Sequence, residues 1–318
     1  TGPLIGLPNS ATFRLFDIVG LDVWAHVYRN VYELAPSDRW RERFIPPGFL
    51  TAMIERGWLG QKKGQGFYRR VEPKNEIQAI DWGSLVYHAA QKPRFATVEQ
   101  VKGVDDLVER LRTLIDSGDR AGVFLWKLCR DYLLYAAERV PEISDRIVEI
   151  DRAMRWGYAH KLGPFELWDA LGLESTARRI ERDGYPLPAS VESMLSSGTT
   201  SFYRTADAHG VAGTEYFDLT ATSYRVLEER PGVVELAPLK RARGVVKQNE
   251  GASLIDVGDG VLCLELHDKS GLLGNCQLDM IQAGIEEVER NFVALVVAGS
   301  DNFCAATALA PLLSAAQR

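Results

Sequence analysis

The chain has 318 residues, of which 46% are hydrophobic and 25% are charged, and its formal net charge at pH 7 is −6. This length accommodates two or three domains, and the composition is that of an ordinary soluble folded protein. The negative charge argues against a nucleic-acid or anionic-membrane partner, because both require a dense basic surface. No apolar run reaches the roughly 18 residues needed to span a bilayer, so we expect no membrane partner.

The first predicted element recurs later in the chain. The segment "ATFRLFDIVGLD" at 11–22 matches "GPFELWDALGLE" at 163–174 with a constant offset of 152. Two further pairs follow in the same order: 46–57 with 187–198, and 66–70 with 201–204. This pattern predicts a tandem duplication of a unit of about 100 residues.

Both copies are predicted to be helical. Pro47 and Pro164 mark first-turn positions, where the missing N–H is not needed. The stretch 123–140 is apolar nearly all round, which is typical of a central buried helix. Asp17 and Asp169 interrupt apolar turns, and we interpret them as structural carboxylates that accept hydrogen bonds from a neighbouring loop, rather than as catalytic groups.

The second copy is preceded by expected helices at about 100–160, whereas the first copy begins ten residues into the chain. The matching helices of the first copy would lie before residue 1. We therefore expect the natural polypeptide to extend upstream.

The last part of the chain changes in character. Asp259-Gly260 lies between two strand-like runs within 251–271, which predicts a tight hairpin. An amphipathic helix (278–288) and a buried strand (292–300) follow. The predicted order is strand, strand, helix, strand. A segment of this size cannot close a substantial core by itself.

The four cysteines form no CxxC pair and no zinc-like spacing with histidine. Cys129, Cys263, Cys276 and Cys304 are typical of thiols in a reducing compartment, so we predict a cytoplasmic protein without a metal site.

The repeated segments, with "GQKKGQGFY" and "EIDRAMRWGYAHKLGPFELWDALGLE", resemble the C-terminal helical domain of 3-hydroxyacyl-CoA dehydrogenases. The segments "ASLIDVGDGVLCLELHDKSGLLG" and "FVALVVAGSDNFCAATAL" resemble the opening of an enoyl-CoA hydratase (crotonase-type) domain. The resemblance implies a mainly α fold, with tandem helical domains followed by a partial α/β crotonase-like segment. The implied parts are the second half of a first helical domain (1–70), a degenerate second one (71–205), a linker (206–245) and the hydratase-like portion (246–318).

The resemblance also implies a parent enzyme of fatty-acid β-oxidation that oxidises (S)-3-hydroxyacyl-CoA with NAD. The chain contains no G-x-G-x-x-G, so we expect its NAD-binding domain to be absent and the fragment to be inactive. The family's substrate-polarising asparagine aligns with Trp126 in the second copy, which implies a structural role for that copy. An acyl-CoA thioester is the implied substrate, and a homodimer is a further expectation.

For the hydratase-like segment, the resemblance implies that the backbone N–H of Thr307 is an oxyanion donor. Lys269, Ala305 and Ala306 are the implied CoA contacts. Two other functions stay open: a non-catalytic helical-repeat scaffold and an acyl-CoA-binding module.

Overall fold

The computed structural model describes residues 1–91, 93–208, 211–228, 232–234, 236, 239–240, 244–267, 272–299 and 306–307. The chain divides into two compact units. The first contains Thr1–Tyr203 and Tyr216–Arg225, and the second contains Arg204–Glu215 and Val226–Arg318. Each unit is described by itself.

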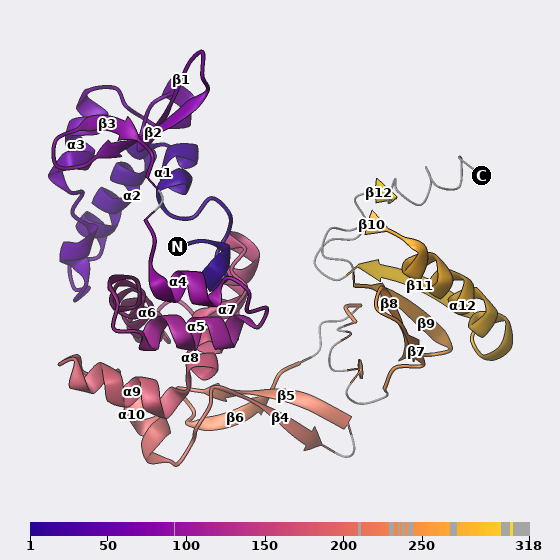
Figure 1. Ribbon diagram of the computed structural model, residues 1–318. Coiled ribbons are helices and arrows are strands. Elements are labelled where there is room, and N and C mark those ends of the chain that lie inside the picture. Colours follow the sequence, from indigo (N-terminus) through magenta and orange to yellow (C-terminus); the bar gives the residue numbers. More distant parts are fainter. Residues whose placement is uncertain are drawn as a thin grey trace. The chain divides into compact units, whose positions relative to one another are not determined.

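The first unit opens with a group of helices followed by a small antiparallel sheet, which we call the first repeat (Figure 1). Gly20 joins its first two α-helices with a φ of 106°, a conformation that favours glycine. In its sheet, of order β1-β2-β3, Tyr68 lies opposite Ala79 and Ala79 opposite His88. The elements are η1 (Pro3–Ile5), α1 (Phe13–Val19), α2 (Leu21–Leu34), η2 (Arg41–Phe44), α3 (Gly48–Glu55), η3 (Gln61–Lys63), β1 (Tyr68–Val71), β2 (Glu76–Asp81) and β3 (Val86–Ala89).

The second repeat has the same succession, preceded by further helices, and Arg204–Glu215 of its sheet are counted with the second unit. The side chains of Asp106 and Asp119 accept the N–H groups of Glu109 and Gly122, which fixes the starts of α5 and α6. The elements are α4 (Ala96–Val101), α5 (Leu107–Asp116), α6 (Arg120–Glu138), α7 (Ile147–Arg152), a π-helix (Ala153–Gly157), α8 (Pro164–Leu171), α9 (Leu173–Arg182), α10 (Ala189–Ser196), β4 (Tyr203–Ala208), β5 (Val211–Asp218) and β6 (Ser223–Val226).

The duplication reaches further than the sequence indicated, because it includes both sheets. After β2, the Asp81 carboxylate accepts the N–H groups of the residues two and three positions on, and Asp218 does the same after β5. The Tyr87 hydroxyl donates to the carbonyl of Gly66, and the Tyr224 hydroxyl donates to the carbonyl of Ser201. Each repeat is therefore a helical part with its own three-stranded sheet.

The two repeats are tied together by polar contacts of α6 with the segment 38–43. The Trp40 indole donates to Glu138 at 2.7 Å. Buried Asp38 accepts from Tyr135 at 3.1 Å and from Arg139 at 3.2 Å. The second repeat therefore covers part of the first one within a single unit.

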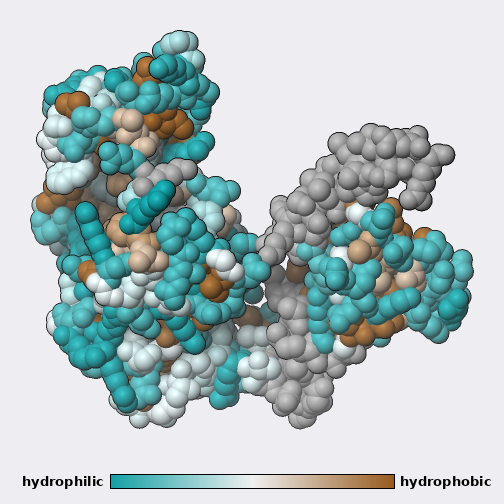
Figure 2. Space-filling view, in the orientation of Figure 1, coloured by the Kyte–Doolittle hydropathy of each residue, from teal (hydrophilic) through white to brown (hydrophobic). Residues whose placement is uncertain are grey.

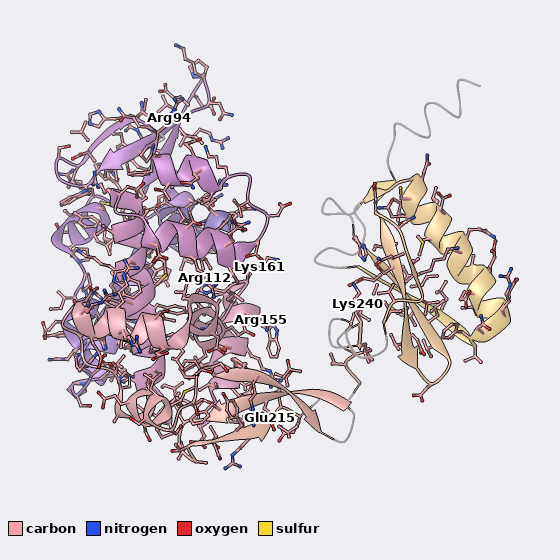
Figure 3. All side chains as sticks on the ribbon, turned by 60° about the horizontal axis from the view of Figure 1, so that its bottom comes forward. Arg94, Arg112, Arg155, Lys161, Glu215 and Lys240 are labelled. Carbon is pink, nitrogen blue, oxygen red and sulfur yellow. The ribbon has the colours of Figure 1, made fainter. Side chains whose placement is uncertain are left out.

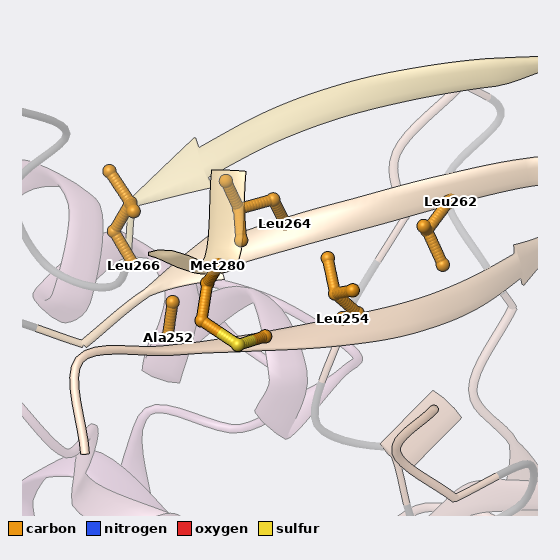
Figure 4. Close-up of a cluster of buried hydrophobic side chains, with 6 residues drawn as sticks. All are labelled: Ala252, Leu254, Leu262, Leu264, Leu266 and Met280. Carbon is orange, nitrogen blue, oxygen red and sulfur yellow. The ribbon is translucent and has the colours of Figure 1, made fainter. Parts of the chain in front are cut away.

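The second unit contains a sheet of order β11-β9-β8-β7 covered on one face by α12. The bounds are β7 (Lys247–Gln248), β8 (Ala252–Gly258), β9 (Val261–Leu266), β10 (Leu272–Leu273), α12 (Asn275–Asn291), β11 (Ala294–Gly299) and β12 (Ala306–Thr307). The core between this sheet and the helix consists of Ala252, Leu254, Leu262, Leu264, Leu266 and Met280 (Figure 4).

The predicted hairpin is confirmed. Asp259 and Gly260 join β8 to β9 with φ values of 52° and 74°, as a two-residue turn of this kind requires. The order strand, strand, helix, strand is confirmed by β8, β9, α12 and β11. β11 pairs with β9 in parallel, whereas β7 and β8 pair antiparallel.

The predicted fold class, mainly α with tandem helical domains and a partial crotonase-like segment, is wrong. Both repeats end in a sheet, and the second unit is built on one, so helices and strands share the fold. The strands at 68–71 and 86–89 have only four residues each, too few for a recognisable alternation, and helix periodicity dominated the prediction. Strands β4–β6 also run into the predicted linker at 206–245.

Within the described residues, no helix is long and apolar enough to cross a membrane.

Replacing Leu264 by alanine tests the core of the second unit. Leu264 is fully buried under α12, so Leu264→Ala should lower the free energy of unfolding by about 2–5 kcal/mol. Val297, its half-exposed partner in the β9–β11 register, is the control, and Val297→Ala should cost less than about 1 kcal/mol. Amide hydrogen exchange of β8 and β9 measures the change in the free energy of unfolding for both variants. Equal decreases for the two variants would contradict this packing.

Candidate functional site

A buried carboxylate fastens the sheet of the first repeat to its helices. Asp17, on α1, accepts the backbone N–H of Phe67 at 2.7 Å and that of Tyr68 at 2.8 Å. Gly60 and Gly66 lie so close to Asp17 that any side chain there would collide with it. Burial raises the pKa of Asp17, although the two N–H groups act in the opposite direction. These contacts are those of a structural carboxylate.

The second repeat contains the same arrangement at Asp169. Its carboxylate accepts the N–H of Phe202 at 2.7 Å and that of Tyr203 at 2.8 Å. Burial raises the pKa of Asp169 to about 6. The prediction that Asp17 and Asp169 are structural carboxylates is therefore confirmed.

A third carboxylate, Asp151 on α7, belongs to the second repeat. It accepts the N–H groups of Phe165 at 2.8 Å and Glu166 at 3.2 Å, and the hydroxyl of Tyr203 donates to it at 2.7 Å. Burial is the main cause that raises its pKa to about 7. Asp151 thereby joins α7 to the start of α8 and to β4.

Other polar groups surround Asp151 without forming a reactive set. The Tyr132 hydroxyl is buried without a hydrogen-bond partner among the described residues, and the ring of Tyr132 lies 6.1 Å from that of His160. Burial lowers the pKa of His160. Arg155, labelled in Figure 3, pairs with Glu166 at 2.8 Å. Because no nucleophile lies beside a positioned base, we assign this cluster to structure.

A hollow of about 350 Å³ opens on the first repeat, between its helices and its sheet. We call it the aromatic groove. It is lined by Phe13, Phe49, Phe67, Tyr68, Ala79, Ile80 and Trp82. Hydrophobic residues reach the surface of this part of the chain in Figure 2.

The equivalent place in the second repeat is closed. Phe13 is 51% exposed, whereas its counterpart Phe165 is fully buried. Trp82 is 68% exposed, whereas its counterpart Leu219 is 6% exposed. The aromatic groove is therefore an apolar surface that the fold covers in one copy and leaves open in the other.

The predicted site residues fall at the end of the second unit. Lys269 and Ala305 lie outside the described residues. Ala306 and Thr307 form β12, which pairs in parallel with β10, and their assignment to CoA and oxyanion binding stays a prediction. Among the described residues, no group of three potential metal ligands converges.

Trp126 has a structural role. It is buried in α6, its indole donates to Asp183 at 2.6 Å, and the guanidinium of Arg179 lies 4.0 Å from its ring centre. These contacts are those of a packing residue, and the alignment of Trp126 with the family's asparagine stays a prediction.

The start of α12 is where a dinucleotide would lie in a fold of this type, and residues 268–271 of the loop before it are outside the described residues. The parallel unit β9–α12–β11 is of the type that binds one, with the phosphates at the helix start. Here the side chain of Gln277 accepts the N–H of Gly274 at 3.0 Å and fills the start of α12. A side chain at Gly251 would collide with Gln277, so protein atoms already occupy this position.

Sequence reasoning missed Asp151 and the aromatic groove. Asp151 stands in "EIDRAM", where the acid follows buried Ile147 and Val148 at helical spacing, and this pattern could have indicated a buried acid. The groove depends on which side chains of the first repeat are covered, and sequence pattern does not report that.

Comparison with known proteins gives dehydrogenase relatives. Residues 3–70 match the family described as "3-hydroxyacyl-CoA dehydrogenase, C-terminal domain". Over all 318 residues the chain is 43% identical to a protein of Bacillus subtilis named "Probable 3-hydroxyacyl-CoA dehydrogenase", and it covers 39% of that protein. Over 190 residues, 58% of the chain, it is 30% identical to a Rickettsia felis protein named "Putative fatty acid oxidation complex trifunctional enzyme", and it covers 25% of that protein.

A solved structure, that of 3-hydroxybutyryl-CoA dehydrogenase from Escherichia coli K12, aligns with a TM-score of 0.37 and 18% identity. The alignment covers 62% of this chain and 56% of that one. The chain spans well under half the length of the Bacillus subtilis and Rickettsia felis proteins. The sequence similarities agree with the predicted resemblance of the chain to 3-hydroxyacyl-CoA dehydrogenases and do not support the predicted crotonase-like segment.

Replacing either structural carboxylate by alanine should destabilise the first unit. Asp17→Ala and Asp169→Ala each leave two backbone N–H groups without an acceptor, so each should cost about 2–3 kcal/mol of unfolding free energy. Asp116→Ala, at an exposed position, should change it by less than about 0.5 kcal/mol. Urea unfolding followed by tryptophan fluorescence measures all three, and a neutral Asp169→Ala would refute the assigned role.

The first unit should lose stability as the pH rises from about 4 to 7. Burial raises the pKa of Asp169 to about 6 and that of Asp151 to about 7, so the folded chain binds more protons than the unfolded chain in this range. The stabilisation is complete below the ordinary carboxyl pKa and is lost through the folded values. Urea unfolding at successive pH values should show a smaller decline for Asp151→Asn than for the unsubstituted chain, and an unchanged decline would contradict the raised pKa.

Proposed function

We propose that this chain is part of a 3-hydroxyacyl-CoA dehydrogenase and forms a non-catalytic body of that enzyme. The proposal rests on one observation, the 43% identity over the whole chain to a protein with that name. The match of residues 3–70 to the C-terminal domain family supports it. The enzyme would oxidise the hydroxyl of a 3-hydroxyacyl-CoA thioester, with NAD as the hydride acceptor.

The contacts of its buried carboxylates support a structural contribution of this chain to that enzyme. The carboxylates of Asp17, Asp151 and Asp169 accept hydrogen bonds that hold helices and strands together. The sequence has no G-x-G-x-x-G, and the start of α12 is filled by Gln277. We therefore assign hydride transfer and NAD binding to a part of the polypeptide outside these 318 residues.

The contacts of Trp126 and of α6 also support this contribution. The second repeat presents α6 to the first repeat through Trp40, Asp38 and their partners. Two repeats fixed to each other in this way form a rigid body. Such a body would position a substrate relative to a catalytic domain. The supporting role accounts for the many buried structural contacts of the first unit.

An NADH-linked assay tests the function. With acetoacetyl-CoA as the substrate of the reverse reaction, the full polypeptide encoded by the reading frame should oxidise NADH, and residues 1–318 alone should not. Trp126→Ala in the full polypeptide should lower stability more than turnover per folded molecule, because Trp126 contacts Asp183 and Arg179. Activity of residues 1–318 alone would contradict the supporting role, and an inactive full polypeptide would contradict the dehydrogenase assignment.

A further inference from the structure

We propose that a cationic surface on the first repeat binds the phosphate groups at the nucleotide end of a CoA thioester. Arg56, Lys63 and Arg69 form this surface, which we call the arginine surface. The inference rests on the proposed function in taking a CoA thioester as the substrate. It assigns the recognition of the phosphates to this chain, whereas the oxidation of the hydroxyl stays outside it.

Positive charge is concentrated in one segment of a chain whose net charge is −6. Residues 56–71 contain no aspartate or glutamate, and their five cationic residues are Arg56, Lys62, Lys63, Arg69 and Arg70. Among the described residues, Lys62 alone of the five has a carboxylate partner, since its Nζ donates to both oxygens of Asp22 at 2.5 and 2.7 Å. The other positive charges of the segment attract an anionic ligand.

The fold brings the loop that carries Lys63 next to β1. The backbone of Gln65 forms a bridge with Gly60 and another with Arg69, so the loop is fixed beside the start of the strand. Arg70 is not part of the arginine surface, because successive side chains of a strand point to opposite faces. The surface is therefore confined to the face of β1 that carries Arg69.

Two guanidinium groups of the surface lie on aromatic rings. The guanidinium of Arg56 lies 5.1 Å from the ring centre of Trp58, and that of Arg69 lies 4.3 Å from the ring centre of Tyr87. The two rings contact each other, with their centres 5.4 Å apart. A guanidinium held on a ring in this way is pre-organised, and its planar N–H groups match the oxygens of a phosphate.

The second repeat has the same arginine but neutralises it. Arg204, the counterpart of Arg69, donates its Nε–H to the carboxylate of Glu215 at 2.7 Å, and Glu215 is labelled in Figure 3. In the first repeat the corresponding position holds Gln78, whose Oε1 accepts the Nε–H of Arg69 at 2.9 Å. An amide keeps the arginine in the same orientation and leaves its charge uncompensated. The geometry is therefore conserved between the repeats, and the free positive charge is specific to the first one.

The chemistry of the surface favours a ligand with more than one phosphate. Its cations come from three places, the end of α3, η3 and β1, so they can contact several anionic oxygens. The nucleotide end of a CoA thioester carries a diphosphate and a 3′-phosphate, whereas the group that reacts is at the opposite end. Binding by the phosphates would position the substrate without a catalytic residue in this chain.

An anionic membrane is the main competing partner for a basic surface. Juxtamembrane segments that bind anionic lipids carry about four to eight basic residues, more than the three of the arginine surface. The net negative charge of the chain also opposes such binding. A small phosphorylated ligand therefore fits this surface better than a membrane does.

Isothermal titration calorimetry of CoA into the chain of 318 residues tests the proposal. CoA should bind with a Kd below about 1 mM. Gln78→Glu recreates the ion pair of the second repeat and should weaken binding about tenfold, because the carboxylate neutralises Arg69. Gln100→Glu adds the same charge at an exposed position of α4 and should change the Kd less than about twofold.

A second pair of variants tests the face of β1. Arg69→Gln should weaken binding about tenfold, whereas Arg70→Gln removes the same charge from the opposite face of the strand and should have less than about a twofold effect. Pantetheine, which lacks the phosphates, should give no saturable binding. Vesicles of phosphatidylserine should not retain the chain on sedimentation.

Four results would overturn the proposal. They are no saturable binding of CoA at millimolar concentration, an unchanged Kd for Gln78→Glu, equal weakening by Arg69→Gln and Arg70→Gln, and binding to the vesicles without binding to CoA. The last result would indicate a membrane surface. None of these measurements uses NADH, so a failure of this inference is distinguishable from a failure of the proposed function.

Discussion

One buried carboxylate, bonded to two successive backbone N–H groups, determines how each repeat is assembled. In the first repeat, Asp17 holds the chain where it turns into β1, and in the second Asp169 does so at β4. A buried acid is costly unless it is fully hydrogen-bonded, and a strand start has N–H groups that need an acceptor. The N–H groups supply the hydrogen bonds that the buried carboxylate needs, and the carboxylate is the acceptor that they need. The helix and the sheet are therefore fixed relative to each other.

With the helix and sheet fixed, the two repeats differ in what covers them. The second repeat adds α7, whose Asp151 bonds to the start of α8 and to Tyr203. This contact closes the apolar space between helix and sheet. In the first repeat the same space is the aromatic groove, with Tyr68 in its lining. A duplicated scaffold thus presents one covered apolar surface and one open groove.

The sequence predicted the duplication and the structural role of Asp17 and Asp169, because identical side chains recur at a constant offset. It also predicted the Asp259-Gly260 hairpin, since few residue pairs adopt two positive φ values. The small sheets were missed in part because three of their strands, β1, β3 and β6, have only four residues each and carry too little alternation. The fold class was wrong because these sheets were missed. The groove was missed because the exposure of its side chains depends on tertiary contacts.

Native-state amide exchange of Phe67, Tyr68, Phe202 and Tyr203 tests the central claim most directly, because these four N–H groups are those bonded to the two carboxylates. The account predicts that all four exchange slowly, near the rate set by unfolding of the first unit. Exchange of these amides at the rate of exposed loop residues would contradict the claim that the carboxylates hold each repeat together.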